Sequence, residues 1–240
     1  MSTSRFIFSL TLVVLVFTAR AQEAKTDSVS RPKKTTGIRF GTDLISLAKS
    51  NVPSANFKGW EVNADVDIRN TFLVLDVGHW ARNIPIPNGQ YNNDGTYFRL
   101  GYDRNILGKD PEKNMLFVGL RYGHSSFSET MNWVDSLSGY DASKIAVART
   151  IQNPSLSSSW AEIVTGIRFR IWKELWMGYT ARMKFFPGLN KNEPLVPYDV
   201  PGYGLTYKRP WWGINYQIYW RIPFKKPAYA KSKKPTATNP

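Results

Sequence analysis

The chain has 240 residues, a formal net charge of +14 and no cysteine. The absence of cysteine excludes a lipid-anchored lipoprotein, which needs a cysteine at its cleavage site, and it also excludes disulfides and thiolate metal sites. A charge this positive often indicates an anionic partner such as nucleic acid or anionic lipid. The export signal described next argues against nucleic acid.

The first 21 residues have the pattern of a secretory signal peptide. Arg5 supplies a short positive region, residues 6–17 form an apolar run, and residues 18–21 supply the small side chains that a signal peptidase needs. The apolar run is about a dozen residues long, whereas a helix needs roughly 20 to span a bilayer. We therefore expect cleavage before Gln22 and export of the mature chain, with a retained anchor helix as the alternative.

Residues 22–36 are polar and are expected to form a flexible lead-in. From residue 37 onward, helical periodicity is nearly absent, and apolar and polar residues alternate with a period of two. In a β-strand, this alternation places apolar side chains on one face and polar side chains on the other. No apolar stretch after residue 21 is long enough for a transmembrane helix, but a barrel strand needs only about 9–11 residues.

The alternation predicts eight strands. In chain order they cover residues 38–44, 60–68, 71–80, 98–103, 116–123, 162–171, 175–185 and 212–224. The third is the least regular, because Phe72 and Val74 share a face with Asp76. The last is the clearest, because every second residue from Trp212 to Phe224 is apolar or aromatic.

The polar faces of these strands carry charges that we expect to pair inside a narrow barrel. Acidic residues predominate on the early strands and basic residues on the late ones, and closure brings the first and last strands together. The expected lumen charge network consists of Arg39, Asp43, Glu61, Asp65, Asp67, Arg99, Asp103, Arg121, Glu162, Arg168, Arg170, Arg182, Lys184 and Arg221. Side chains fill an eight-stranded barrel and buried charges need partners, so we interpret the network as filling; an ion or proton path is the alternative.

The connections between the predicted strands alternate in length. They run over about residues 48–56, 69–70, 82–95, 107–113, 130–158, 172–173 and 188–210. With both chain ends on one side, the longer connections lie at the opposite end, as in transmembrane barrels with short periplasmic turns and long external loops. This asymmetry favours a polar interior and a lipid-facing apolar surface. A soluble periplasmic barrel that binds an apolar ligand is the alternative.

Residues 225–240 follow the last strand and contain five lysines among Pro, Ala and Thr. This composition predicts a disordered basic tail. The tail is interpreted as a solvated spacer, with a contact to an anionic periplasmic surface as the alternative.

Across residues 36–224, the pattern resembles the small eight-stranded outer-membrane β-barrels of Gram-negative bacteria, in particular an uncharacterised family known only as a domain of unknown function. The closing strand that ends at Phe224 resembles the signal for outer-membrane insertion, although sixteen residues follow it here. The resemblance implies an all-β fold: a single antiparallel, up-and-down transmembrane β-barrel in the outer membrane. Its implied partners are outer-membrane lipid and the insertion machinery. The expected role is non-enzymatic, in envelope integrity or surface interaction through external loops.

One segment suggests a catalytic alternative. Residues 121–126 resemble the strand of the lipid A deacylase barrels in which a His-x-Ser pair faces the lipid, so His124 and Ser126 are the candidate base and nucleophile for ester cleavage. That family has an Asn after the Ser, where this chain has Phe127. The two histidines, His79 and His124, do not have metal-ligand spacing, and no Gly-rich phosphate loop is present, so no metal and no cofactor are expected.

Overall fold

The computed structural model describes residues 37–68, 71–107, 114–138, 144–185, 187–189, 195–207 and 210–224. The chain divides into two units, Met1–Lys34 and Thr35–Pro240, and every described residue belongs to the second. The expected signal peptide, lead-in and basic tail lie outside the described residues. In the described ranges, no helix combines the length and the apolar character needed to cross a membrane.

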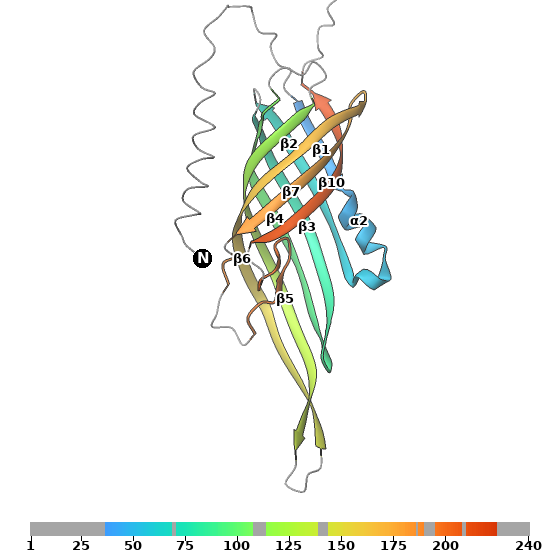
Figure 1. Cartoon of the computed structure of the whole chain (residues 1–240), viewed down its shortest axis with the longest axis vertical. Helices are drawn as coiled ribbons and strands as arrows, with labels where there is room; N and C mark the ends of the chain where they lie inside the picture. Colours follow the sequence, from blue (N-terminus) through green and yellow to red (C-terminus); the bar gives the residue numbers. More distant parts are fainter. Residues whose placement is uncertain are drawn as a thin grey trace, which may run out of the picture. The chain divides into compact units, whose positions relative to one another are not determined.

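Eight antiparallel strands close into a barrel in the order β1-β10-β7-β6-β5-β4-β3-β2, which confirms the all-β fold (Figure 1). The elements are β1 (Gly37–Asp43), α2 (Leu44–Ser50), the 3-10 helix η1 (Pro53–Ala55), β2 (Phe57–Ile68), β3 (Thr71–Ile86), β4 (Gly89–Asn105), β5 (Met115–Ser138), β6 (Lys144–Trp172), β7 (Leu175–Phe185), β8 (Asp199–Val200), β9 (Gly204–Leu205) and β10 (Trp211–Pro223). Closure occurs where β1 pairs with β10, from Gly37 opposite Pro223 to Asp43 opposite Gln217. We call the end that holds Gly37 and Pro223 the near end, and the opposite end the far end.

The period-two alternation places one face of each strand inside the barrel and the other outside. On β3, Val74 and Asp76 are 2% and 1% exposed, whereas Leu75 and Val77 are 42% and 36% exposed. Phe72 is also buried, so the face that looked irregular in the sequence is an inward face of mixed character. The polar faces of the other strands likewise turn inward, and the apolar faces turn outward.

The far-end strands are much longer than the sequence pattern indicates. The expected loops at 82–95 and 130–158 are mainly strand, because β5 has 24 residues and β6 has 29. Figure 1 shows β5 and β6 continuing together beyond the rest of the ring. The sequence missed these segments because polar residues occupy both faces there, so the contrast on which a period-two pattern depends disappears.

The first strand is short because Asp43 begins a helix instead of continuing the sheet. Its carboxylate accepts hydrogen bonds from the Ser46 backbone N–H (3.0 Å) and hydroxyl (2.6 Å), which is the role of an N-cap. It also accepts one from the Tyr216 backbone N–H on β10, at 3.0 Å. Ser50, at the end of α2, accepts from the Gly59 N–H and donates to the Gly59 carbonyl on β2. These side chains replace bonds that a longer β1 would make to its two neighbours.

Candidate functional site

The interior of the barrel is a compact set of paired charges. The members share inward-facing strand positions and side chains buried from solvent, and they come from all eight long strands. They are Arg39, Asp43, Glu61, Asp65, Asp67, Asp76, Arg99, Asp103, Arg121, Glu162, Arg168, Arg182, Lys184 and Arg221. A charge removed from water is tolerable only with good partners, so the pairing of this set determines whether the barrel is stable.

Towards the near end, acids and bases alternate along a chain of ion pairs. Arg39 pairs with Asp65 at 2.8 Å, and Arg168 joins Asp65 (3.2 Å) to Asp103 (3.0 Å). Arg121 then pairs with Asp103 at 2.7 Å. Each carboxylate therefore contacts two guanidinium groups contributed by different strands, and the chain ties opposite walls of the barrel together.

Towards the far end, a second chain is centred on Arg182. Its guanidinium lies 3.1 Å from Asp76 and 3.2 Å from Glu162. Arg99 lies 2.7 Å from Glu61 and 3.1 Å from Glu162. The planar guanidinium can serve several carboxylates at fixed angles, which suits arginine to this position. The two chains meet where Asp76 lies 3.9 Å from Arg121.

An apolar cluster fills the near end of the interior. It consists of Phe72, Val74, Met115, Phe117 and Val164, all buried. The guanidinium of Arg39 lies 4.5 Å from the centre of the Phe72 ring, and that of Arg168 lies 4.5 Å from the Phe117 ring. These cation–π contacts link the apolar cluster to the ion pairs.

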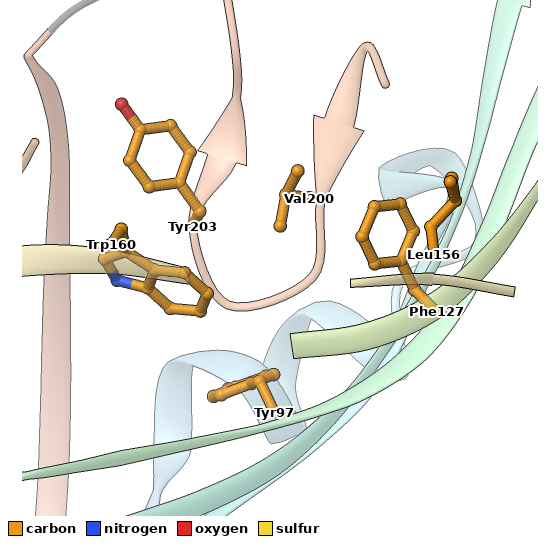
Figure 2. Packing of buried hydrophobic residues seen from close by; sticks show 6 residues of the cluster. All are labelled: Tyr97, Phe127, Leu156, Trp160, Val200 and Tyr203. Carbon is orange, nitrogen blue, oxygen red and sulfur yellow. The ribbon is translucent and has the colours of Figure 1, made fainter. Parts of the chain in front are cut away.

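The connection between β7 and β10 folds back and closes the far end. We call residues 195–207, which include β8 and β9, the plug hairpin. Val200 and Tyr203 have no exposed surface, and they pack among Tyr97, Phe127 and Trp160 (Figure 2). This segment was expected to be part of a loop, because strands of two residues are too short to show a period-two pattern.

Two cations from the charge network hold the turn of the plug hairpin. Lys184 Nζ donates to the Gly202 carbonyl at 2.7 Å and to the Tyr203 carbonyl at 2.9 Å. Arg99 Nη2 donates to the same Gly202 carbonyl at 3.0 Å. The charges predicted from the strands therefore also position a segment that lies outside the predicted strands.

Asp199 anchors the other side of the plug hairpin. Its carboxylate is fully buried, pairs with Arg82 at 2.9 Å and accepts from the Asn93 amide at 3.0 Å. Burial raises the pKa of the Asp199 carboxyl, and the charge of Arg82 opposes that rise. Close by, Glu129 accepts from the Tyr91 hydroxyl at 2.6 Å. Arg82, Tyr91, Asn93 and Asp199 could not be predicted as part of the interior because they lie in segments expected to be loops, and Glu129 directly precedes such a segment.

The position of Gly202 gives a test of the plug hairpin. Its backbone has φ +80°, and a Cβ added there would lie 2.5 Å from Cγ of Tyr97. Gly202→Ala is therefore expected to push the hairpin out of the barrel and to speed protease cleavage between β7 and β10 severalfold. Gly188→Ala, in the same connection, is the control, because its nearest neighbour would be the Ser159 carbonyl at 3.5 Å. Equal resistance of the two variants would contradict this role of the hairpin.

One predicted member of the charge network lies elsewhere. Arg170 has inward parity but is exposed, and within the described ranges it makes no ion pair. It lies at the near-end rim, next to a register shift between Arg170 and Trp172 that precedes the turn to β7. The alternation predicted correctly that Arg170 lies on the inward face of β6. Because this position is at the rim of the barrel, the neighbouring strands do not bury its side chain.

The structure gives His124, one of the two candidate catalytic residues, a hydrogen-bonding partner other than Ser126. His124 Nδ1 lies 2.9 Å from Ser159 Oγ on β6, and the Tyr122 hydroxyl lies 2.9 Å from the same oxygen. Residues two apart on a strand are separated by about 6.5 Å, whereas directly opposite residues on paired strands lie closer. Ser126 instead lies opposite Ser157. In the part of the chain that the structure describes, no carboxylate is hydrogen-bonded to His124.

The described residues contain no group of three or more side chains suited to hold a metal ion. The ion pairs, the apolar cluster and the plug hairpin together fill the barrel from end to end.

These features define a closed eight-stranded antiparallel β-barrel with an ion-paired interior and an apolar exterior. The chain belongs to the DUF6048 family, a domain of unknown function whose model matches residues 3–227. No curated protein matches the chain. The expected relation to an uncharacterised family is thus confirmed.

Proposed function

We propose that this protein is a non-enzymatic β-barrel of the Gram-negative outer membrane, closed to solutes, which presents its far-end strands at the cell surface. The observation that carries the proposal is the apolar band: the outward-facing side chains that surround the ring between its near end and the middle of β3. Its exposed members include Leu73, Leu75, Leu100, Leu120, Tyr122, Ile163, Ile167, Tyr179, Ile214, Trp220 and Ile222. Soluble monomers rarely expose contiguous apolar patches above a few hundred Å², so a continuous band favours a lipid surrounding.

The strand register shows where the apolar band ends. One row across four paired strands consists of Leu75, Leu100, Tyr122 and Ala161. Two rows further towards the far end lies what we call the boundary row, formed by Trp60, His79, Thr96, Ser126 and Ser157. Beyond the boundary row, the outward residues are mainly polar. This change within a few residues on β3, β4, β5 and β6 is typical of a membrane–water interface.

Aromatic residues at the two limits of the apolar band support the same placement. Trp60 and Trp212 lie towards the far end and are 43% and 63% exposed. Trp172 and Phe224 lie towards the near end and are 62% and 59% exposed. Lys173 Nζ lies 4.6 Å from the centre of the Trp172 ring. Aromatic and basic side chains are enriched at membrane interfaces, where one part contacts lipid and the other water.

The route to the membrane would use two segments at opposite ends of the chain. The signal peptide of residues 1–21 would direct export, and the closing strand that ends near Phe224 would be recognised by the outer-membrane insertion machinery. With both ends of the barrel at the near end, the near end would face the periplasm. The extended far-end strands would then face the exterior, where they are available for surface interaction.

The first experiment is fractionation of cells that express the chain with its signal peptide. We expect the protein in the outer-membrane fraction, with a change in SDS-gel mobility on boiling, because folded membrane barrels resist SDS until heated. Purified protein in planar lipid bilayers should produce no stable channel openings, because the plug hairpin and ion pairs fill the lumen. Recovery as a soluble periplasmic protein without a mobility shift would contradict the membrane assignment, and stable conductance would contradict the closed interior.

A further inference from the structure

A groove lies on the outside of the barrel, just beyond the boundary row, with a volume of about 610 Å³. Its floor is formed by β3, β4 and β5, and the connection that contains α2 and η1 forms one wall. The lining residues include Val52, Pro53, Phe57, Asn83, Asn92 and Thr130. Small-molecule sites commonly have volumes of about 300–1,000 Å³, so the groove can hold a ligand of a few linked rings.

The floor of the groove presents polar side chains that make no hydrogen bonds to other described residues. Asn83 lies opposite Asn92, and Asn92 lies opposite Thr130, so the three form one row across the outer face of the sheet. Within the described residues, none of their side chains has a hydrogen-bonding partner, and the same holds for the hydroxyl of Ser128. These amides and hydroxyls are only half-buried and remain available to a ligand.

The side chain of Asn93, next to Asn92 in the sequence, is fully hydrogen-bonded to other parts of the fold. Asn93 points inward, and its amide donates to the Asp199 carbonyl at 2.6 Å and to the Asp199 carboxylate at 3.0 Å. Its side-chain oxygen accepts from the Arg82 N–H at 3.1 Å. The adjacent Asn92 makes no such bonds on the outer face. The stability of the barrel therefore explains Asn93, but it does not explain the outward amides of Asn83 and Asn92.

The charges at the groove favour a neutral polar ligand. Asp94 has a side chain that is 65% exposed, and one of its oxygens lies 3.0 Å from His79 Nε2. Lys58 is exposed at the same level of β2. The lining also contains Arg82, which is paired with Asp199, and Glu129, which accepts from the Tyr91 hydroxyl. Two acidic and two basic side chains therefore balance, unlike a site for a nucleic acid or a polyphosphate, which would be strongly basic. The remaining outward groups each offer donors and acceptors.

Amides and hydroxyls in a row match the vicinal hydroxyls of a sugar, which also donate and accept. The wall adds the apolar edges of Val52, Pro53 and Phe57, against which the C–H face of a sugar ring can pack. Asn56, next to them, has a left-handed backbone (φ 49°) that turns the connection back towards β2. The groove thus has both kinds of surface that a carbohydrate presents.

We propose that this groove binds the glycan of an outer-membrane glycolipid. The inference rests on the proposed membrane location, which sets the boundary row at the membrane surface. Asn83 and Asn92 lie two rows further towards the far end on the same strands. A glycan attached to a lipid in the outer leaflet would emerge at this level, beside the groove. The anchored lipid would contact the apolar band while its sugar fills the groove.

The test measures binding of lipopolysaccharide, and of phosphatidylcholine as the comparison lipid, to the full-length folded protein held in detergent micelles. Wild type is expected to bind lipopolysaccharide and not phosphatidylcholine. The double variant Asn83→Leu, Asn92→Leu keeps the number and branching of the side-chain heavy atoms but loses two amides, and its affinity for lipopolysaccharide is expected to fall about tenfold or more. The control is Gln90→Leu, which removes an exposed amide from the next outward position of β4, outside the groove, and should leave binding unchanged.

Two results would overturn the glycolipid proposal: equal affinity of wild type and the double variant for lipopolysaccharide, or binding of phosphatidylcholine as tight as that of lipopolysaccharide. The heat-dependent gel shift, measured on every variant, separates loss of binding from loss of folding. Barrels that stay in the outer membrane but do not bind lipopolysaccharide would refute the groove assignment alone. Recovery of the wild type in the soluble fraction would refute the membrane location, and with it the reason for a lipid-linked glycan.

Discussion

Replacing Arg182 by Met is expected to destabilise the folded barrel by about 3–5 kcal/mol, since removal of one partner leaves buried charges uncompensated. Its guanidinium lies within 3.5 Å of Glu61, Asp76 and Glu162, and its Nε–H donates to the Asn215 side chain at 2.6 Å. Met occupies a similar volume without a charge, so packing changes little. The measurement is the urea midpoint of unfolding in detergent micelles, followed by tryptophan fluorescence.

The matched control is Arg149→Met, which removes an arginine from the far-end extension. Arg149 pairs with Asp135 at 2.7 Å, but the two side chains are 49% and 40% exposed. Exposed ion pairs contribute at most about 1 kcal/mol, so this variant should unfold close to wild type. Similar midpoints for the two variants would show that the interior pairs do not hold the barrel closed.

Leu100→Arg is expected to separate a membrane barrel from a soluble one. Leu100 lies in the middle of the apolar band and is 55% exposed. An arginine at the bilayer midplane costs a membrane barrel about 2–4 kcal/mol, whereas surface substitutions in soluble proteins usually stay within about 0.5 kcal/mol. We therefore expect reduced insertion into lipid vesicles and a lower unfolding midpoint in lipid.

Val134→Arg provides the comparison for Leu100→Arg. Val134 is 41% exposed, but it lies on β5 far beyond the boundary row, where the preceding outward residues Thr130 and Asn132 are polar. Under the proposed topology this position faces water, so the variant should insert and unfold like wild type. Equal, small effects at the two positions would indicate that water surrounds the apolar band as well.

The number and order of the strands could be predicted from local sequence because period-two alternation is a local property. The closing strand is the clearest example: Trp212, Ile214 and Trp220 are exposed, whereas Gln217 and Tyr219 are buried. The same alternation predicted which charged residues are buried inside the barrel, with the exception of Arg170. Arg170 has inward parity, but its burial depends on where the neighbouring strands end. Asp76 belongs to the centre of the network, although Phe72 and Val74 on its face obscured the pattern.

The sequence could not identify the partners of these groups. His124 bonds to Ser159, which is 35 residues away, because the register of β5 against β6 brings them together. The groove depends on the same register, since Asn83, Asn92 and Thr130 come from three strands. Register is set by the whole sheet and its turns, so no single strand carries this information.

By itself, the sequence determined the fold class, the eight strands and the face of each strand that carries charge, because side-chain direction follows from the backbone of one strand. Only the tertiary structure decided that the charged face is the interior and that β5 and β6 extend beyond the ring. It also decided that residues 195–207 close the far end. These features depend on contacts between distant segments, such as Arg82 with Asp199 and Lys184 with Gly202, and no local pattern encodes such contacts.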